Sequence, residues 1–272
     1  MKSELAIKEK QALTLIKSLD GLEPELAYSG GKDSDVILAL AQMSGIKFHP
    51  IYKMTTIDPP FTEAHVKSKG VSIMKPKKTF FELIQQKGFP TRRARFCCEV
   101  LKEYKIRDKA ILGIRKHESA KRSKLYNEPS MCRVYADKSR CEQFYPILDW
   151  TNDDVADFIN YYGISCHPLY YADSEFDVSK RLGCMGCPLK SDNGKSDFVK
   201  YPKLVRQWIR NGKVFMENHP DAAVHRKFGN IYNLFFHDIF CHSYYEYCLK
   251  TDGLFGKLDC KQWLENYFKI EL

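Results

Sequence analysis

One stretch, LAYSGGKDSDVILAL at residues 26–40, constrains the fold more than any other part of the chain. Its apolar start suits a buried strand, its glycines allow a tight turn, and apolar residues at helical spacing follow. A strand, a glycine turn and a helix N-terminus form an anion site, because free backbone N–H groups and the positive end of the helix dipole face the turn. Lys32 adds a charge suited to a phosphate. The alternative is an ordinary strand–helix turn with a surface lysine.

The SGGKDS sequence at residues 29–34 resembles the pyrophosphate-binding loop of the N-type ATP pyrophosphatases, in particular the phosphoadenylyl-sulfate (PAPS) reductase branch. It is not a Walker A loop, which requires Gly-x-x-x-x-Gly-Lys-Ser/Thr. The resemblance extends over about residues 25–190. It implies an adenine nucleotide bound over the loop, with chemistry at the α-phosphate or at the sulfate attached to it. The nucleotide ligands that it implies in this loop are Ser29, Gly30, Gly31, Lys32, Asp33 and Ser34.

Strand-like and helix-like segments alternate along the chain. Further strands are predicted at 47–54, 71–74 and 110–114, and helices at 3–19, 61–69, 79–87, 98–105 and 152–161, the last with Thr151 as N-cap. This alternation predicts an α/β fold with a doubly wound, mostly parallel sheet and ligands at the carboxyl ends of its strands. We expect a nucleotide-binding domain at 1–190 and a helical C-terminal region packed on it at 191–272. The aromatic residues of that region suit a packed subdomain, or a surface that stacks bases.

Two further segments follow predicted strands, and the same resemblance makes them nucleotide ligands. Thr56 and Asp58 occupy the place of the loop that holds the adenosine, although Asp-Pro-Pro replaces the usual Asp-Thr-Gly. Gly113, Arg115 and Arg122 belong to a segment similar to the family's Gly-x-Arg-x-x-Glu-Ser signature, in which arginines can clamp phosphate or sulfate oxygens. The resemblance gives catalytic roles to Lys32, Asp33 and Arg115. A turn-capping aspartate and a solvated basic run are the alternatives.

The chain has ten cysteines, which are not expected to form disulfides in a cytosolic protein, so that their grouping is more informative. Cys97 and Cys98 are adjacent, and Cys184 and Cys187 form a C-x-x-C motif. A tandem pair with a distant C-x-x-C resembles the [4Fe–4S] site of the cluster-containing sulfonucleotide reductases, in which four thiolates hold the cluster. Zinc on the same four thiolates and unliganded cysteines are the alternatives.

Charge and hydropathy restrict the partners. The net charge of +9, from 43 basic and 34 acidic residues, favours an anionic ligand such as an adenine nucleotide and permits nucleic acid. No apolar run reaches membrane-spanning length, and the N-terminus lacks the apolar core of a signal peptide, so a cytoplasmic protein without a membrane partner is predicted. A sulfur-transfer protein and a second copy of the chain are candidate partners, and Mg²⁺ is a candidate ion.

Three functions remain open. The first is an ATP pyrophosphatase that splits the α–β bond of ATP to activate a target, with sulfur transfer to nucleic acid as one outcome. The second is an adenylyl-sulfate (APS) or PAPS reductase that releases sulfite. The third is a non-catalytic nucleotide or redox sensor. Reductases of this family carry their nucleophile on a mobile Glu-Cys-Gly tail. Here Cys260 lacks that context and precedes residues suited to a docked helix, while Cys241 and Cys248 suit buried thiols. The missing tail favours the first function, and the intact loop argues against the third.

Overall fold

The computed structural model describes residues 3–239 and 259–272, so Cys241 and Cys248 lie outside the described residues. The chain divides into two compact units. The first contains residues 1–54, 58–76 and 101–183, and the second contains residues 55–57, 77–100 and 184–272. A segment from the middle of the chain therefore joins the C-terminal part in one unit.

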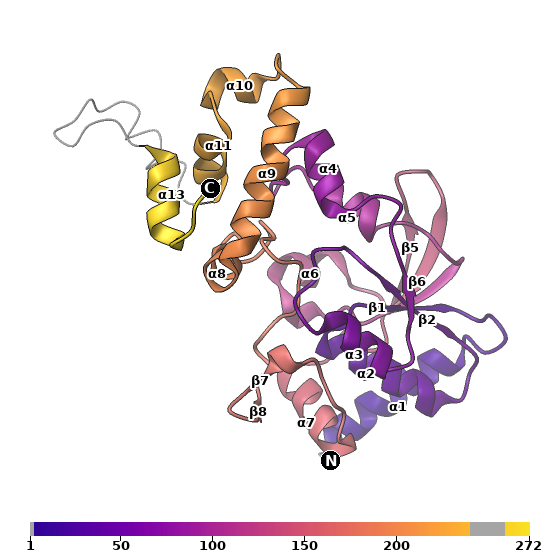
Figure 1. Cartoon of the computed structure of the whole chain (residues 1–272). Helices are drawn as coiled ribbons and strands as arrows, with labels where there is room; N and C mark the ends of the chain where they lie inside the picture. Colours follow the sequence, from indigo (N-terminus) through magenta and orange to yellow (C-terminus); the bar gives the residue numbers. More distant parts are fainter. Residues whose placement is uncertain (1–2, 240–258) are drawn as a thin grey trace. The chain divides into compact units, whose positions relative to one another are not determined.

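A six-stranded sheet forms the centre of the first unit, with the strand order β3-β2-β1-β4-β6-β5 (Figure 1). All neighbouring pairs are parallel except β5 and β6. This confirms the predicted mostly parallel, doubly wound α/β fold, to which an unpredicted antiparallel hairpin is added at one edge. The strands are β1 Glu25–Tyr28, β2 His49–Lys53, β3 Ser72–Met74, β4 Lys109–Leu112, β5 Ser130–Val134 and β6 Arg140–Phe144. A separate two-stranded ribbon pairs β7 Tyr171–Ala172 with β8 Glu175–Phe176.

The winding of the sheet reverses at β1. This strand pairs with β2 on one side and with β4 on the other, so that Leu26 is opposite both Pro50 and Ile111. In open parallel sheets the loops after two such strands lead away from each other and leave a crevice at the carboxyl ends. The SGGKDS loop follows β1 and the segment from Gly113 follows β4. The fold therefore places two of the predicted nucleotide-binding elements side by side.

Helices α1 Ser3–Lys17, α2 Lys32–Ser44 and α7 Asn152–Tyr162 pack together beside the sheet (Figure 1). The prediction of Thr151 as the N-cap of α7 is confirmed, because its side chain accepts a hydrogen bond from the Asp154 amide. The predicted helix at 98–105 is wrong in extent. Helix α5 is Phe96–Leu101, because the Arg95 carbonyl already accepts from the amides of Cys98 and Glu99. The shorter helices of the first unit are α3 Thr62–Ser68 and α6 Ala120–Leu125, whereas residues 96–100 of α5 belong to the second unit.

The second unit is helical and has an aromatic core. Its helices are α4 Phe80–Lys87, α8 Lys195–Lys200, α9 Pro202–Asn218, α10 Ala223–Phe228, α11 Ile231–Ile239 and α13 Cys260–Phe268. Buried rings contact one another with centroid distances between 5.2 and 6.4 Å: Phe80, Phe89, Phe198, Trp208 and Phe235. Gly212 of α9 belongs to this packing, since a Cβ there would lie 2.7 Å from Phe89.

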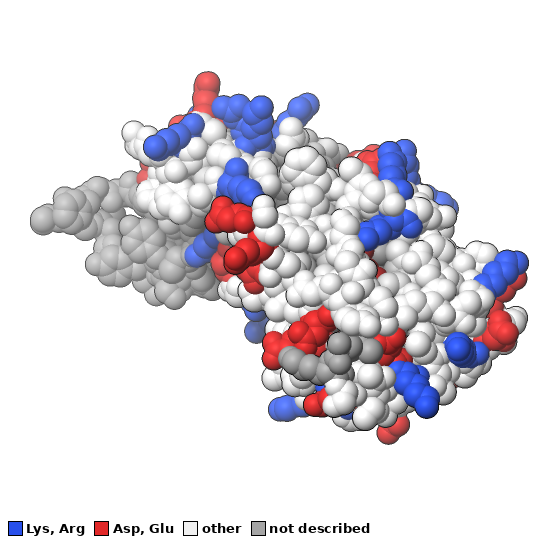
Figure 2. Space-filling view, turned by 90° about the horizontal axis from the view of Figure 1, so that it is seen from below, with Lys and Arg blue, Asp and Glu red and all other residues white. Residues whose placement is uncertain are grey.

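Charged side chains are distributed over the surface. On the face shown in Figure 2, basic and acidic side chains are interspersed. Among the described residues, no helix is both long enough and apolar enough to cross a membrane.

Candidate functional site

The start of helix α2 forms the floor of the candidate site. Gly31 is the N-cap residue and supplies no side-chain cap. The first helical residue is Lys32, of which only 4% is exposed. A helix N-terminus carries a partial positive charge, so a buried cation there is electrostatically unfavourable until an anion joins it. The sequence correctly predicted the strand, turn and helix around this lysine, but not its burial.

Two acidic residues of the first turn already have partners. Asp33 accepts a hydrogen bond from Arg115 Nε at 2.7 Å and lies 3.4 Å from Lys32 Nζ. Asp35 is buried, accepts from the Tyr28 hydroxyl and lies 3.1 Å from His65 Nε2. Asp33 is therefore shared between Arg115 and Lys32, and its contact with Lys32 is the longer of the two.

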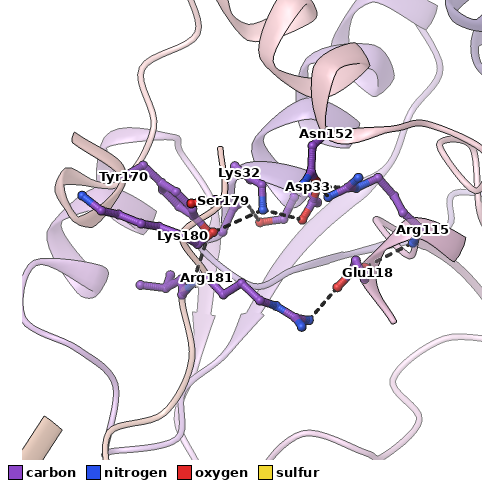
Figure 3. A network of polar contacts seen from close by, with 12 residues as sticks. Lys32, Asp33, Arg115, Glu118, Asn152, Tyr170, Ser179, Lys180 and Arg181 are labelled. Carbon is purple, nitrogen blue, oxygen red and sulfur yellow. Dashed lines mark hydrogen bonds and ion pairs between the residues drawn. The ribbon is translucent and has the colours of Figure 1, made fainter. Parts of the chain in front are cut away.

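Arg115 has a different environment from the one that its sequence motif implies. Its guanidinium is 1% exposed, and besides Asp33 it donates to the Trp150 carbonyl and to Asn152 Oδ1, at 3.2 and 3.0 Å (Figure 3). With three protein acceptors it has little capacity left for a phosphate, so in this geometry it positions Asp33. Gly113 lets the start of the arginine segment lie close to the main chain of Asp33, because a Cβ at this position would lie 2.8 Å from the Asp33 carbonyl oxygen.

A pocket of about 260 Å³ opens over the loop. Its volume is below the range of about 300–1,000 Å³ that is typical of sites burying a whole drug-sized ligand. It suits the phosphate end of a nucleotide better than the whole molecule. Loop and strand-end residues in its lining are Ser29, Gly31, Lys32, Asp33, Ser34 and Gly113, together with Glu118 and Arg122 of the predicted arginine segment.

Two arginines share one carboxylate at this pocket. Glu118 is 9% exposed and accepts a hydrogen bond from Arg181 at 2.8 Å (Figure 3). It also accepts from Arg122. Charge-assisted contacts of this kind can be exchanged for contacts with phosphate oxygens, because arginine binds carboxylate and phosphate in the same way. Glu118 thus holds both arginines beside the place where an anion would bind.

Residues 180–182 cross the site and were not predicted from the sequence. The Lys180 carbonyl accepts from Lys32 Nζ at 3.4 Å, and the Leu182 amide donates to the Tyr170 hydroxyl at 3.2 Å. That hydroxyl also accepts a hydrogen bond from the Lys32 amide, and burial raises the pKa of Tyr170 above its usual value. No motif singles out these residues. The only available signal was the position of Arg181 three residues before Cys184.

Thr56 and Asp58, predicted as ligands of the nucleotide, do not line this pocket. Thr56 belongs to the second unit and Asp58 to the first. The Thr56 hydroxyl accepts a hydrogen bond from the Phe80 amide at 2.8 Å, just before helix α4. A role for these two residues in holding the sugar or the base stays a prediction.

The four cysteines of the two motifs all belong to the second unit. A hydrogen bond with Cys98, burial and the nearby thiols of Cys98, Cys184 and Cys187 raise the pKa of Cys97 well above its usual value. The fold therefore brings the tandem pair and the C-x-x-C motif into one neighbourhood. Among the described residues, however, no group of three or more His, Cys, Asp or Glu side chains is arranged to hold a metal ion.

The surroundings of the C-x-x-C motif fit an inserted cluster. Gly186 lies inside the motif with a φ of +68°, and a Cβ there would lie 2.9 Å from the Trp208 ring. The indole N–H of Trp208 is buried and has no acceptor within the described part of the chain. Buried donors are rarely left unsatisfied, and cluster sulfurs accept such hydrogen bonds. A buried donor without an acceptor, on a ring that contacts the C-x-x-C motif at Gly186, fits a group that brings sulfur acceptors.

Comparison with known proteins places this geometry in a family. Residues 23–190 match the model of the phosphoadenosine phosphosulfate reductase domain. Uncharacterized proteins of Methanocaldococcus jannaschii and of Escherichia phage 186 are 29% and 35% identical, over 74% and 53% of this chain. The chain spans about half the length of these curated relatives, 52% of the first and 46% of the second.

Solved structures with a similar course of the chain are more distant. A PAPS reductase from Candida auris in complex with phosphate has 14% identity and a TM-score of 0.47, covering 68% of this chain and 96% of its own. The U34-tRNA thiolase NcsA from Methanococcus maripaludis, solved with its [4Fe-4S] cluster, has 12% identity and a TM-score of 0.38, covering 80% and 81%. The family assignment rests on the sequence model, which matches well over half of the chain and contains all the residues that line the pocket. The chain belongs to the phosphoadenosine phosphosulfate reductase domain family.

Proposed function

We propose that this protein is an ATP pyrophosphatase-type enzyme that cleaves the α–β bond of ATP to activate an acceptor. In this reaction an acceptor oxygen attacks the α-phosphorus, a new P–O bond forms to it, and pyrophosphate leaves with the electron pair of the broken bond. The observation that carries the proposal is the buried Lys32 at the start of α2, where the N-cap residue is a glycine without a side-chain cap. This arrangement favours an anion, and departing pyrophosphate supplies more charge than any other part of the reaction.

Other residues of the pocket have roles in the same step. Arg122 and Arg181 can leave Glu118 to contact phosphate oxygens, while Arg115 fixes Asp33 beside Lys32. Asp33 is then a candidate ligand of Mg²⁺, the usual companion of bound polyphosphates. All the residues named in these assignments belong to the first unit.

A [4Fe–4S] cluster held by Cys97, Cys98, Cys184 and Cys187 is part of the proposal. Such a cluster supplies a redox-active or structural centre. Four thiols around a single zinc ion would lie close together, at about 2.3 Å from the metal. Zinc on the same four thiolates is the alternative, and metal analysis of the purified protein distinguishes the two.

The sulfonucleotide reductase is the second candidate, and the family assignment is the observation that favours it. A reductase needs a thiolate that reaches the sulfate sulfur. Cys260 is only 3% exposed and begins helix α13, in which Leu264 and Phe268 are also buried. A buried thiol on a packed helix is poorly suited to act as a mobile nucleophile.

One experiment separates the two reactions. Anaerobically purified protein is incubated with ATP, APS or PAPS, nucleotide products and sulfite are measured, and the peptide containing Cys260 is analysed by mass spectrometry. With no acceptor added, water attacks the α-phosphorus in its place, so we expect AMP and pyrophosphate from ATP, no sulfite, and no sulfonate on Cys260. Sulfite release accompanied by a sulfonated Cys260, both lost in Cys260→Ser, would establish the reductase instead.

A further inference from the structure

Helix α9 has two unlike faces. Its buried face, which includes Leu204, Trp208 and Gly212, packs within the second unit. The opposite face carries a series of basic side chains, which are exposed except for the half-buried last one: Lys203, Arg206, Arg210 and Lys213. Their spacing of three, four and three residues keeps them on one face of the helix. At 1.5 Å per residue the series extends over about 15 Å.

The basic series on α9 lacks acidic partners. None of its four cations forms an ion pair with a carboxylate among residues 3–239 and 259–272. Arg206 Nε donates to the main-chain carbonyl of Glu271 at 2.9 Å, which leaves its charge unneutralised. Some other basic side chains are paired, as Lys67 is with Glu63 and Lys105 with Asp108. Unpaired like charges in a row repel one another and favour a partner of opposite charge.

An aromatic ring lies at the C-terminal end of the series. Tyr232 of α11 is half-buried, and its ring centroid lies 4.9 Å from Lys213 Nζ and 5.8 Å from Lys261 Nζ of α13. Three helices thus bring two ammonium groups to one ring. Aromatic rings beside cations are the usual platform on which bases of a single-stranded nucleic acid stack, while the cations follow its backbone.

We propose that the basic series on α9, together with Tyr232, binds the backbone of a single-stranded nucleic acid. About 15 Å of helix is the length over which several phosphates of one strand can be contacted. A membrane surface fits less well, because interfacial helices need large apolar side chains beside the cations, and none of the exposed large apolar residues lies on α9. The idea that this strand is the acceptor of the activated phosphate rests on the proposed function. The idea that the strand binds here does not.

The test measures binding directly. Fluorescence anisotropy is recorded with labelled poly(U) and poly(dT) of about 20 nucleotides and with a duplex of the same length, over a range of salt concentrations. The variant replaces Lys203, Arg206 and Arg210 by Gln. We expect it to lower affinity by at least about tenfold, and to reduce the slope of log K against log salt by about 2, since each lost phosphate contact in a single strand contributes about 0.7.

The matched control replaces three exposed cations of the first unit, Lys10, Lys17 and Lys138, by Gln. It removes the same charge and should leave most of the affinity. Equal losses in both variants would overturn the proposal, because net charge alone would then explain binding. Tighter binding of the duplex than of either single strand, or of anionic vesicles than of poly(U), would overturn it as well.

Tyr232 provides the second variant. Tyr232→Leu should weaken single-strand binding about tenfold, whereas Tyr232→Phe should retain it, since only the leucine removes the ring. Cleavage of ATP is measured without nucleic acid in all variants. Loss of nucleic-acid binding in the α9 variant, together with no ATP cleavage by the wild type, would support this surface and refute the proposed function. Unchanged nucleic-acid binding in the α9 variant, together with ATP cleavage by the wild type, would refute the surface alone.

Discussion

At the scale of single residues, the position of Lys32 combines a cost for stability with a use in binding. The positive end of a helix disfavours a neighbouring cation by about 0.3–1 kcal/mol. We expect Lys32→Ala to leave the free protein as stable or slightly more stable, and to weaken ATP binding by about 1.5–3 kcal/mol through loss of a charge-assisted contact. Thermal unfolding and calorimetry with ATP check the two effects, with the exposed Lys10→Ala as control. Unchanged affinity for ATP would contradict the assignment of this loop as the nucleotide-binding element.

Arg181 makes a more selective prediction. Its guanidinium reaches the phosphate pocket and is paired there with Glu118, as is Arg122. If it transfers to the departing phosphates, Arg181→Gln should weaken binding of ATP and pyrophosphate by about tenfold and leave AMP almost unaffected, because AMP lacks those groups. Competition binding with the three ligands measures this. Equal losses for ATP and AMP would mean that Arg181 only supports the fold of the pocket.

Only some of these residue roles follow from sequence. The SGGKDS loop is local, so its glycines, lysine and helix start are visible in one stretch. The role of Arg115 depends on Asn152 and on the carbonyl of Trp150, which come from a distant segment. The same holds for Tyr170, whose hydroxyl meets the amide of Leu182 only in the folded chain.

At the scale of elements, helix α7 is fixed at its first turn by a capping box and by an ion pair. Asp154 Oδ2 accepts from the Thr151 amide at 2.8 Å and from Lys8 Nζ of α1 at 2.7 Å. Burial opposes ionisation, but the hydrogen bonds from Lys8 and Thr151 outweigh it and lower the pKa of Asp154 below 3.8. A lowered pKa in the folded state stabilises the protein above the unfolded value and ceases to do so as the pH falls through the folded value.

We therefore expect Asp154→Asn to lower the free energy of unfolding by about 1 kcal/mol at neutral pH, and the difference from wild type to shrink as the pH falls below about 4. Urea unfolding of both proteins, at neutral pH and below about pH 4, measures this difference in the free energy of unfolding. Asp153→Asn, an exposed change in the same turn, is the control and should cost less. A difference that does not change with pH would mean that packing, and not the ionised carboxylate, fixes the helix.

Elements with one buried face were predicted well, whereas the two strands of the edge hairpin were missed. Helices α1, α4 and α7 and the parallel strands have apolar periodicity, because each has one face or more in a core. The hairpin of β5 and β6 extends the sheet at its edge. Strand β5 has no buried residue, so its sequence SMCRV shows no alternation of apolar and polar residues.

At the scale of the whole molecule, the cysteines come from two distant parts of the chain and meet in one unit. Anaerobically purified protein should be brown and contain about four irons per chain. Cys184→Ser should abolish the colour, and Cys132→Ser, an exposed cysteine of the first unit, should retain it. Iron analysis and visible absorption check this. A colourless wild type with stoichiometric zinc would replace the cluster by a single-ion site.

Sequence spacing predicted that grouping, but not the unit that contains it. The motif pattern is recognisable without structure, whereas the packing of residues 77–100 with the C-terminal helices depends on complementary apolar faces. Phe80 and Phe89 on one side meet Trp208 and Phe235 on the other. No local pattern states which apolar helix face covers which.

This discontinuous packing has a consequence for how such proteins can be divided or recombined. A fragment ending near residue 190 would keep α4 but lose α9, which packs against it. Phe80, Leu83 and Ile84 would then face water, at a cost of about 1.5–3 kcal/mol for each side chain uncovered. Exchange of C-terminal helices between relatives therefore has to carry residues 77–100 along, so that the two stretches are inherited as one part.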